Sequence, residues 1–93
     1  MAEYLLELYI PRADPATVAD AAERARAAAG EVSAEGLSVR YVRAIFVPED
    51  ETCFFLWEAC SAEAAREAAA RAGLGSDRVT EALGERKDEQ ACL

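Results

Sequence analysis

The chain has 93 residues, of which 53% are hydrophobic and 30% are charged, as is typical of one small globular domain. Its net charge of -8 at pH 7 argues against nucleic acid or a membrane surface as a partner, because binding to either depends on clustered Lys and Arg. No apolar run approaches the roughly 20 residues of a spanning helix and no start resembles a signal peptide, so we expect a cytoplasmic protein.

The first half of the chain predicts a strand, a helix and a second strand. Residues 3–10, EYLLELYI, partly alternate between polar and apolar and end at Pro11. Asp14 followed by proline is a helix start, and we expect that helix over 15–29, with Gly30 as its end. Residues 37–47 are rich in β-branched and aromatic side chains, which favours a strand that ends before Pro48.

The second half predicts a turn, a strand, a helix and a last short strand. PEDE forms the turn, Thr52–Ala59 the third strand, and Ser61 caps a helix that ends at Gly73. The last strand is expected at about 77–83. The order β-α-β-β-α-β predicts a ferredoxin-like split βαβ domain of the α+β class over residues 1–83, with both helices on one face of a four-stranded antiparallel sheet and a flexible, charged tail over 84–93.

The predicted sheet is apolar on both faces. In the third strand Cys53, Phe55 and Trp57 point one way, while Phe54 and Leu56 point the other. One of these sets must lie away from the helices, and a small monomer would expose it as a large apolar patch. We therefore expect a homodimer in which two sheets stack face to face as a dimeric α+β barrel.

Three segments, EYLLELYIP, VRYVRAIFVPEDETCFFLWEA and AREAAARAGLGSDRVTEAL, resemble a family of small bacterial proteins. Most members belong to a domain of unknown function, and one branch is named as nickel-binding. The resemblance covers residues 3–83 and implies a ferredoxin-like subunit that dimerises. The resemblance also implies a divalent metal ion, nickel, as a cofactor.

The chain departs from this family at one position. Members often carry a histidine in the second helix where this chain has Ala68, and the chain has no histidine at all. Nickel prefers nitrogen or thiolate donors, whereas a site of carboxylates alone favours hard ions such as magnesium or calcium. The odd count of three cysteines, without CxxC spacing, indicates neither a disulfide framework nor a zinc ribbon. The sequence chemistry therefore does not support nickel binding.

Adjacent carboxylates in the predicted turn form the first candidate site. Glu49, Asp50 and Glu51 could share a divalent cation, although calcium loops need more oxygen ligands and a glycine at a fixed offset. The alternative is a solvated hairpin tip. Cys53, next to this turn, is interpreted as a small buried hydrophobic residue of the third strand.

Charged and polar side chains on the strands form the second candidate site. If they project from the sheet face that lacks helices, they line the space between two stacked sheets and could bind a small ligand. Arg43, which we expect to alternate with Tyr41 and Ile45, could pair with Glu7 or Glu58 in a purely structural interface or in a ligand pocket. The predicted ligand-binding residues are Glu7, Tyr9, Arg43, Glu58 and Glu81.

The sequence favours a homodimeric accessory protein that binds a small molecule or a metal ion, with no catalytic residue assigned. The alternative is a cofactor-independent enzyme of the monooxygenase, isomerase or cyclase type, which are reactions found on dimeric α+β barrels. Without histidine, acid–base catalysis there would fall to Glu7, Glu58 or Tyr9, assisted by Arg43.

Overall fold

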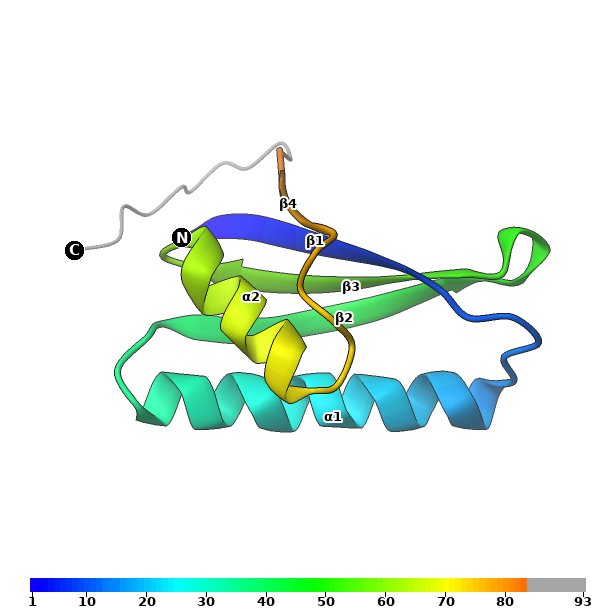
Figure 1. Cartoon of the computed structure of the whole chain (residues 1–93), viewed down its shortest axis with the longest axis horizontal. Helices are drawn as coiled ribbons and strands as arrows, with labels where there is room; N and C mark the ends of the chain where they lie inside the picture. The colour runs from blue at the N-terminus through cyan, green and yellow to red at the C-terminus, as the bar shows by residue number, and fades with distance from the viewer. Residues whose placement is uncertain (84–93) are drawn as a thin grey trace.

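The computed structural model describes residues 1–83, and the predicted tail over 84–93 lies outside the described residues. The elements follow the predicted order and are shown in Figure 1. Their bounds are β1 (Ala2–Tyr9), α1 (Pro15–Ala34), β2 (Val39–Val47), β3 (Thr52–Ala59), α2 (Ala62–Arg71) and β4 (Val79–Ala82).

The four strands form one antiparallel sheet in the order β2-β3-β1-β4. Both helices lie on the same face of this sheet, with α1 along β2 and α2 beside α1 (Figure 1). This arrangement is the ferredoxin-like α+β fold, which confirms the predicted fold class.

Helix α1 begins as predicted but ends five residues later than expected. The Asp14 side chain accepts a hydrogen bond from the Thr17 backbone N–H at 2.8 Å and caps the first turn. Gly30 does not end the helix, because Val32 lies beyond it and packs into the core with 1% of its surface exposed. The left-handed residue that follows the helix is Gly36, at φ +106°.

Helix α2 has the predicted cap and the predicted end. Ser61 accepts a hydrogen bond from the Ala64 backbone N–H at 3.2 Å, and Gly73 adopts φ +77° after the last turn. Arg24 of α1 donates a hydrogen bond to the Ala72 carbonyl at 2.9 Å. This contact satisfies a terminal carbonyl of α2 from the neighbouring helix.

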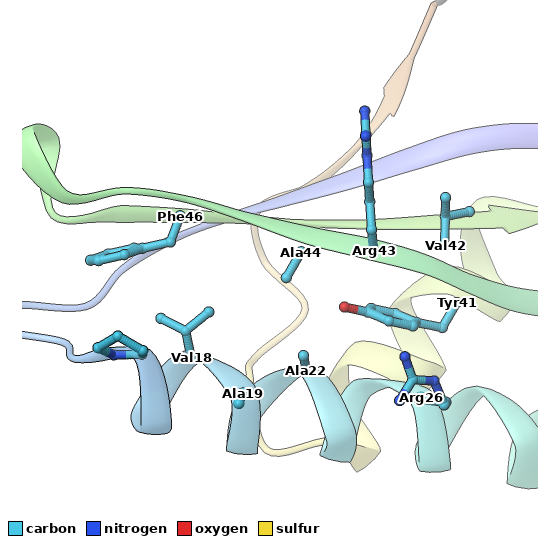
Figure 2. A pocket seen from close by; sticks show the side chains of 10 residues that line it. Val18, Ala19, Ala22, Arg26, Tyr41, Val42, Arg43, Ala44 and Phe46 are labelled. Atoms are coloured by element: carbon cyan, nitrogen blue, oxygen red, sulfur yellow. The ribbon is translucent and has the colours of Figure 1, made fainter.

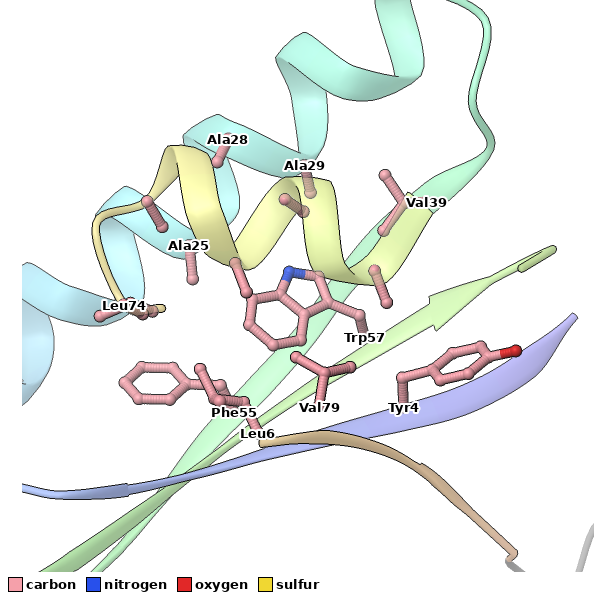
Figure 3. Close-up of a cluster of buried hydrophobic side chains, with 14 of the residues drawn as sticks. Tyr4, Leu6, Ala25, Ala28, Ala29, Val39, Phe55, Trp57, Leu74 and Val79 are labelled. Carbon is pink, nitrogen blue, oxygen red and sulfur yellow. The ribbon is translucent and has the colours of Figure 1, made fainter. Parts of the chain in front are cut away.

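The core lies between the sheet and the two helices, and Figure 3 shows its centre. Trp57, Phe55 and Leu6 supply the largest fully buried side chains from the sheet. The helices contribute mainly alanines, since small side chains let them lie close to the large residues of the strands. The buried helical residues are Ala21, Ala25, Ala28, Ala29, Val32, Ala64, Ala65, Ala68 and Ala69.

Neither helix within residues 1–83 combines the length and the apolar character that a membrane span requires.

Candidate functional site

The face of the sheet opposite the helices, here called the open face, carries the candidate site. Side chains at paired positions of neighbouring strands project from the same face. The positions paired across β1, β2 and β3 therefore define the open face, whose members are Glu3, Leu5, Glu7, Tyr9, Arg40, Arg43, Ile45, Val47, Thr52, Phe54, Leu56 and Glu58.

The structure brings four of the five predicted ligand-binding residues onto the open face. Glu7, Tyr9, Arg43 and Glu58 all belong to it. Glu81 does not, because it pairs with Tyr4, whose side chain is buried on the helix-covered face. The fifth residue therefore lies on the other side of the sheet from the rest.

A β-bulge at Val42 corrects the predicted alternation of β2. Tyr41 pairs with Trp57 and Arg43 pairs with Leu56, which leaves Val42 as an extra residue. Tyr41 consequently shares the helix-covered face with Trp57, whereas Arg43 and Ile45 lie on the open face. The predicted regular alternation of Tyr41, Arg43 and Ile45 is therefore wrong between Tyr41 and Arg43, because the bulge shifts it by one residue.

Glu58 is a buried charged residue, with 7% of its surface exposed. Arg40 lies directly opposite it on β2 and forms an ion pair with its carboxylate. Glu3 lies opposite Glu58 on the other side, on β1. A buried carboxylate needs a close counter-charge to offset its loss of hydration, and Arg40 supplies one.

The sequence did not reveal Arg40 as the partner of Glu58. If β2 and β3 paired regularly from their turn onward, Arg40 would lie opposite Ala59. The bulge moves it by one residue, to Glu58. One signal could have pointed to Arg40. Arg40 and Arg43 stand three residues apart in RYVR, and regular alternation would put them on opposite faces of the strand.

Glu7 has a different ion-pair partner from the one expected. Its Oε1 lies 3.6 Å from a guanidinium nitrogen of Arg78, which precedes β4. Both side chains are at least half exposed, so the pair contributes little to stability. Arg43 lies on β2, opposite Leu56.

The acidic turn between β2 and β3 has a structural role at Glu51. Pro48–Asp50 form a single 3-10 turn, and Glu51 follows in the left-handed conformation at φ 52°. The Glu51 carboxylate accepts hydrogen bonds from the Tyr9 hydroxyl at 3.2 Å and from the Arg12 backbone N–H at 2.8 Å. The hydrogen bond and charge of Glu51 raise the pKa of Tyr9 above its ordinary value. One of the three predicted turn carboxylates therefore anchors the loop after β1.

The cysteines do not form a metal or redox pair within the described residues. Cys53 is a fully buried free thiol, as predicted, and burial raises its pKa. Cys60 is exposed after β3 and is disulfide-bonded, a bond that the sequence, which shows no sign of a disulfide framework, did not predict.

Among residues 1–83, no three His, Cys, Asp or Glu side chains are grouped as they would be to hold a metal ion. Ala68, the position at which the resembling family often carries histidine, is fully buried in the core. The described residues thus lack both the nitrogen donor and a carboxylate cluster that could replace it.

Comparison with known proteins places this fold in a family. The family model described as "Nickel responsive protein SCO4226-like" matches residues 4–82. The crystal structure of SCO4226 from Streptomyces coelicolor A3(2) superimposes with a TM-score of 0.75 at 21% identity, over 91% of this chain and 100% of that one. No curated protein matches the chain. Because the family model matches most of its length, the chain belongs to the SCO4226-like nickel responsive protein family.

Proposed function

We propose that this protein is a homodimeric accessory protein in which two open faces stack and enclose a site for a small ligand. The observation that carries this proposal is the open face itself, which combines large apolar side chains with the ion pair of Glu58 and Arg40.

Solvent exposure on this face supports the dimer. Ile45 is 41% exposed and Tyr9 is 64% exposed in a single protomer, and Leu5, Phe54 and Leu56 are only partly covered. These residues adjoin one another across three strands, so they form a contiguous patch rather than scattered single exposures. A two-fold partner would cover the patch with the same residues of its own sheet.

The charges around the patch support a polar site between the sheets. Arg43 and the pairs Glu58–Arg40 and Glu7–Arg78 flank the apolar residues. A few polar groups around an apolar surface are typical of small-ligand sites, since the apolar part provides affinity and the polar part provides orientation.

Nickel does not fit the residues that the structure describes, although the family is described as nickel responsive. Histidine is absent, and the free thiol of Cys53 is enclosed in the core. The carboxylates that remain favour hard ions with oxygen ligands. We expect calorimetric titration of metal-free protein to give no saturable binding of Ni²⁺ at micromolar concentrations. Stoichiometric micromolar binding of Ni²⁺ would contradict this part of the proposal.

Two charge substitutions of equally exposed residues test the dimer. Ile45→Glu places a carboxylate on the apolar patch of the open face, whereas Leu37→Glu, at 37% exposure, places one in the loop after α1. We expect Ile45→Glu to be monomeric in native mass spectrometry and Leu37→Glu to remain dimeric, with both variants folded by circular dichroism. An unchanged dimer in Ile45→Glu would place the interface elsewhere.

The enzyme alternative has less support from these contacts. A carboxyl that acts as a general base near neutral pH is usually held without a close counter-charge. Glu58 and Glu7 each have an arginine partner.

A further inference from the structure

A groove of about 510 Å³ lies on the helix-covered side of the molecule, between α1 and β2 (Figure 2). β2 is an edge strand, so no further strand closes the groove on the outer side of β2. The helical wall runs from Pro15 to Arg26, a span of roughly 16 Å at the rise of an α-helix. The groove is therefore elongated and lies on the helix-covered side of the sheet, although Arg43 of the open face also lines it.

The residues in the middle of both walls are small. Ala19 and Ala22 of α1 lie across from Ala44 of β2, and these three methyl groups leave the space unfilled. Val18 and Phe46 form the apolar end of the groove near the start of α1 (Figure 2). An extended aliphatic chain matches such a channel better than a broad ring system does.

Polar groups gather at the other end of the groove. The Tyr41 side chain extends along it, and its hydroxyl points toward the middle (Figure 2). Within the described residues this hydroxyl has no hydrogen-bond partner. The Arg26 guanidinium lies 5.3 Å from the centre of the Tyr41 ring and uses one nitrogen to bind Glu23 at 2.8 Å. The other guanidinium nitrogens of Arg26 can donate to a ligand.

The charge of the lining also points to an anionic head group. The chain has 18 acidic and 10 basic residues, yet both charged residues that line the groove are arginines. The Arg43 guanidinium points away from α1, so Arg26 is the cation available within the groove (Figure 2). Guanidinium binds a carboxylate through two parallel hydrogen bonds.

We propose that this groove binds a linear amphipathic carboxylate of the fatty-acid class. The aliphatic chain lies along Val18, the three alanines and Phe46, while the carboxylate accepts hydrogen bonds from the Arg26 guanidinium and the Tyr41 hydroxyl. This site does not require the stacked sheets, so an experiment can reject it without rejecting the proposed dimer.

Calorimetric titration with decanoate, kept below its critical micelle concentration, tests the ligand class. We expect saturable binding with one site per protomer, and binding of 1-decanol weaker by about tenfold because it lacks the charged head. Acetate, which has the head without the chain, should show no binding. No saturable decanoate binding, or equal affinity for 1-decanol, would overturn the proposal.

Matched variants test the polar end and the middle of the groove. Arg26→Gln should weaken decanoate binding by about tenfold and Arg26→Lys should recover part of it, whereas Arg66→Gln, on the exposed side of α2, should have no effect. Ala22→Leu should fill the groove and abolish binding, while Ala27→Leu, on the exposed side of α1, should not. Binding that survives both Arg26→Gln and Ala22→Leu would overturn the assignment of this site.

Amide chemical shifts provide a readout of location. On addition of decanoate, we expect the shifts of Val18, Ala22 and Ala44 to change and those of Leu5 and Leu56 on the open face to stay constant. Changes confined to the open face would mean that the carboxylate binds between the sheets and would contradict the groove.

Discussion

Glu51 shows how one acidic residue can hold two loops together. Its carboxylate binds the Tyr9 hydroxyl and the Arg12 N–H, and its carbonyl accepts a hydrogen bond from the Ile10 N–H at 2.8 Å. The turn between β2 and β3 is thereby fixed to the segment that leads into α1, close to the apolar end of the groove.

A titration of Tyr9 tests this role of Glu51. Glu51→Gln weakens the hydrogen bond and removes the charge that together raise the pKa of Tyr9, so that pKa should fall toward the ordinary value of 10.0. Glu49→Gln, in the same turn, is the control and should leave it unchanged. Carbon-13 NMR of the tyrosine ring resolves Tyr9 from the other tyrosines. An identical midpoint for Tyr9 in Glu51→Gln and the native protein would contradict the contact.

At the same scale, the sequence placed four of the five predicted site residues on the open face but did not predict how they pair. Glu7, Tyr9 and Glu58 were found because strand alternation is regular in β1 and β3. The partner Arg40 was missed because no local signal marks Val42 as a bulge; the bulge depends on how β2 fits against β3. Pairing across strands is a tertiary property, which single-strand patterns do not contain.

Helix α1 shows the same limit for a whole element. Gly30 is a good signal for a helix end, yet the helix continues to Ala34, because the burial of Val32 outweighs the low helix propensity of one glycine. The start at Asp14 and Pro15 was predicted correctly, because capping is a local interaction.

The position of Gly30 inside α1 leads to a prediction about the free energy of unfolding. A Cβ added at Gly30 meets no atom within 4 Å, so Gly30→Ala should stabilise the protein by about 0.5–1 kcal/mol through helix propensity. Gly36→Ala is the matched control and should destabilise it, because φ is +106° there. Urea unfolding measures both. A loss of stability in Gly30→Ala would show that α1 is interrupted at that residue.

Arg71 connects the two helices. Its guanidinium binds Glu67 of α2 at 2.9 Å and Glu35, the C-cap of α1, at 2.6 Å, with Glu31 3.7 Å away. The hydrogen bond from Arg71 lowers the pKa of Glu35 below its ordinary value of 4.5. Because the folded-state pKa is lowered, the stabilisation is complete above pH 4.5 and is lost as the pH falls through the lower folded value.

Arg71→Gln should therefore lower the melting temperature at pH 7 by a few degrees, and the difference from the native protein should shrink below pH 4.5. Arg66→Gln on the same helix serves as the control, since its side chain is exposed. A difference that stays constant from pH 7 to pH 3 would show that Arg71 acts through packing rather than through its charge.

At the scale of the whole molecule, the fold covers only one face of its sheet. The helices bury Trp57, Phe55 and Leu6, while the opposite face keeps Ile45 and Tyr9 in solvent. The sequence predicted this asymmetry, because apolar residues occupy both alternating sets of β3. It did not predict the groove between α1 and β2, which depends on three alanines brought together by helix-on-strand packing.

The molar mass of the native protein in solution tests the central claim most directly. Sedimentation equilibrium at micromolar protein should give twice the 10.0 kDa mass of the chain, because stacked open faces bury the apolar patch in a two-fold dimer. A mass of 10.0 kDa across the micromolar range would show that the open face stays exposed to solvent, and would contradict the proposed homodimer and the site between its sheets.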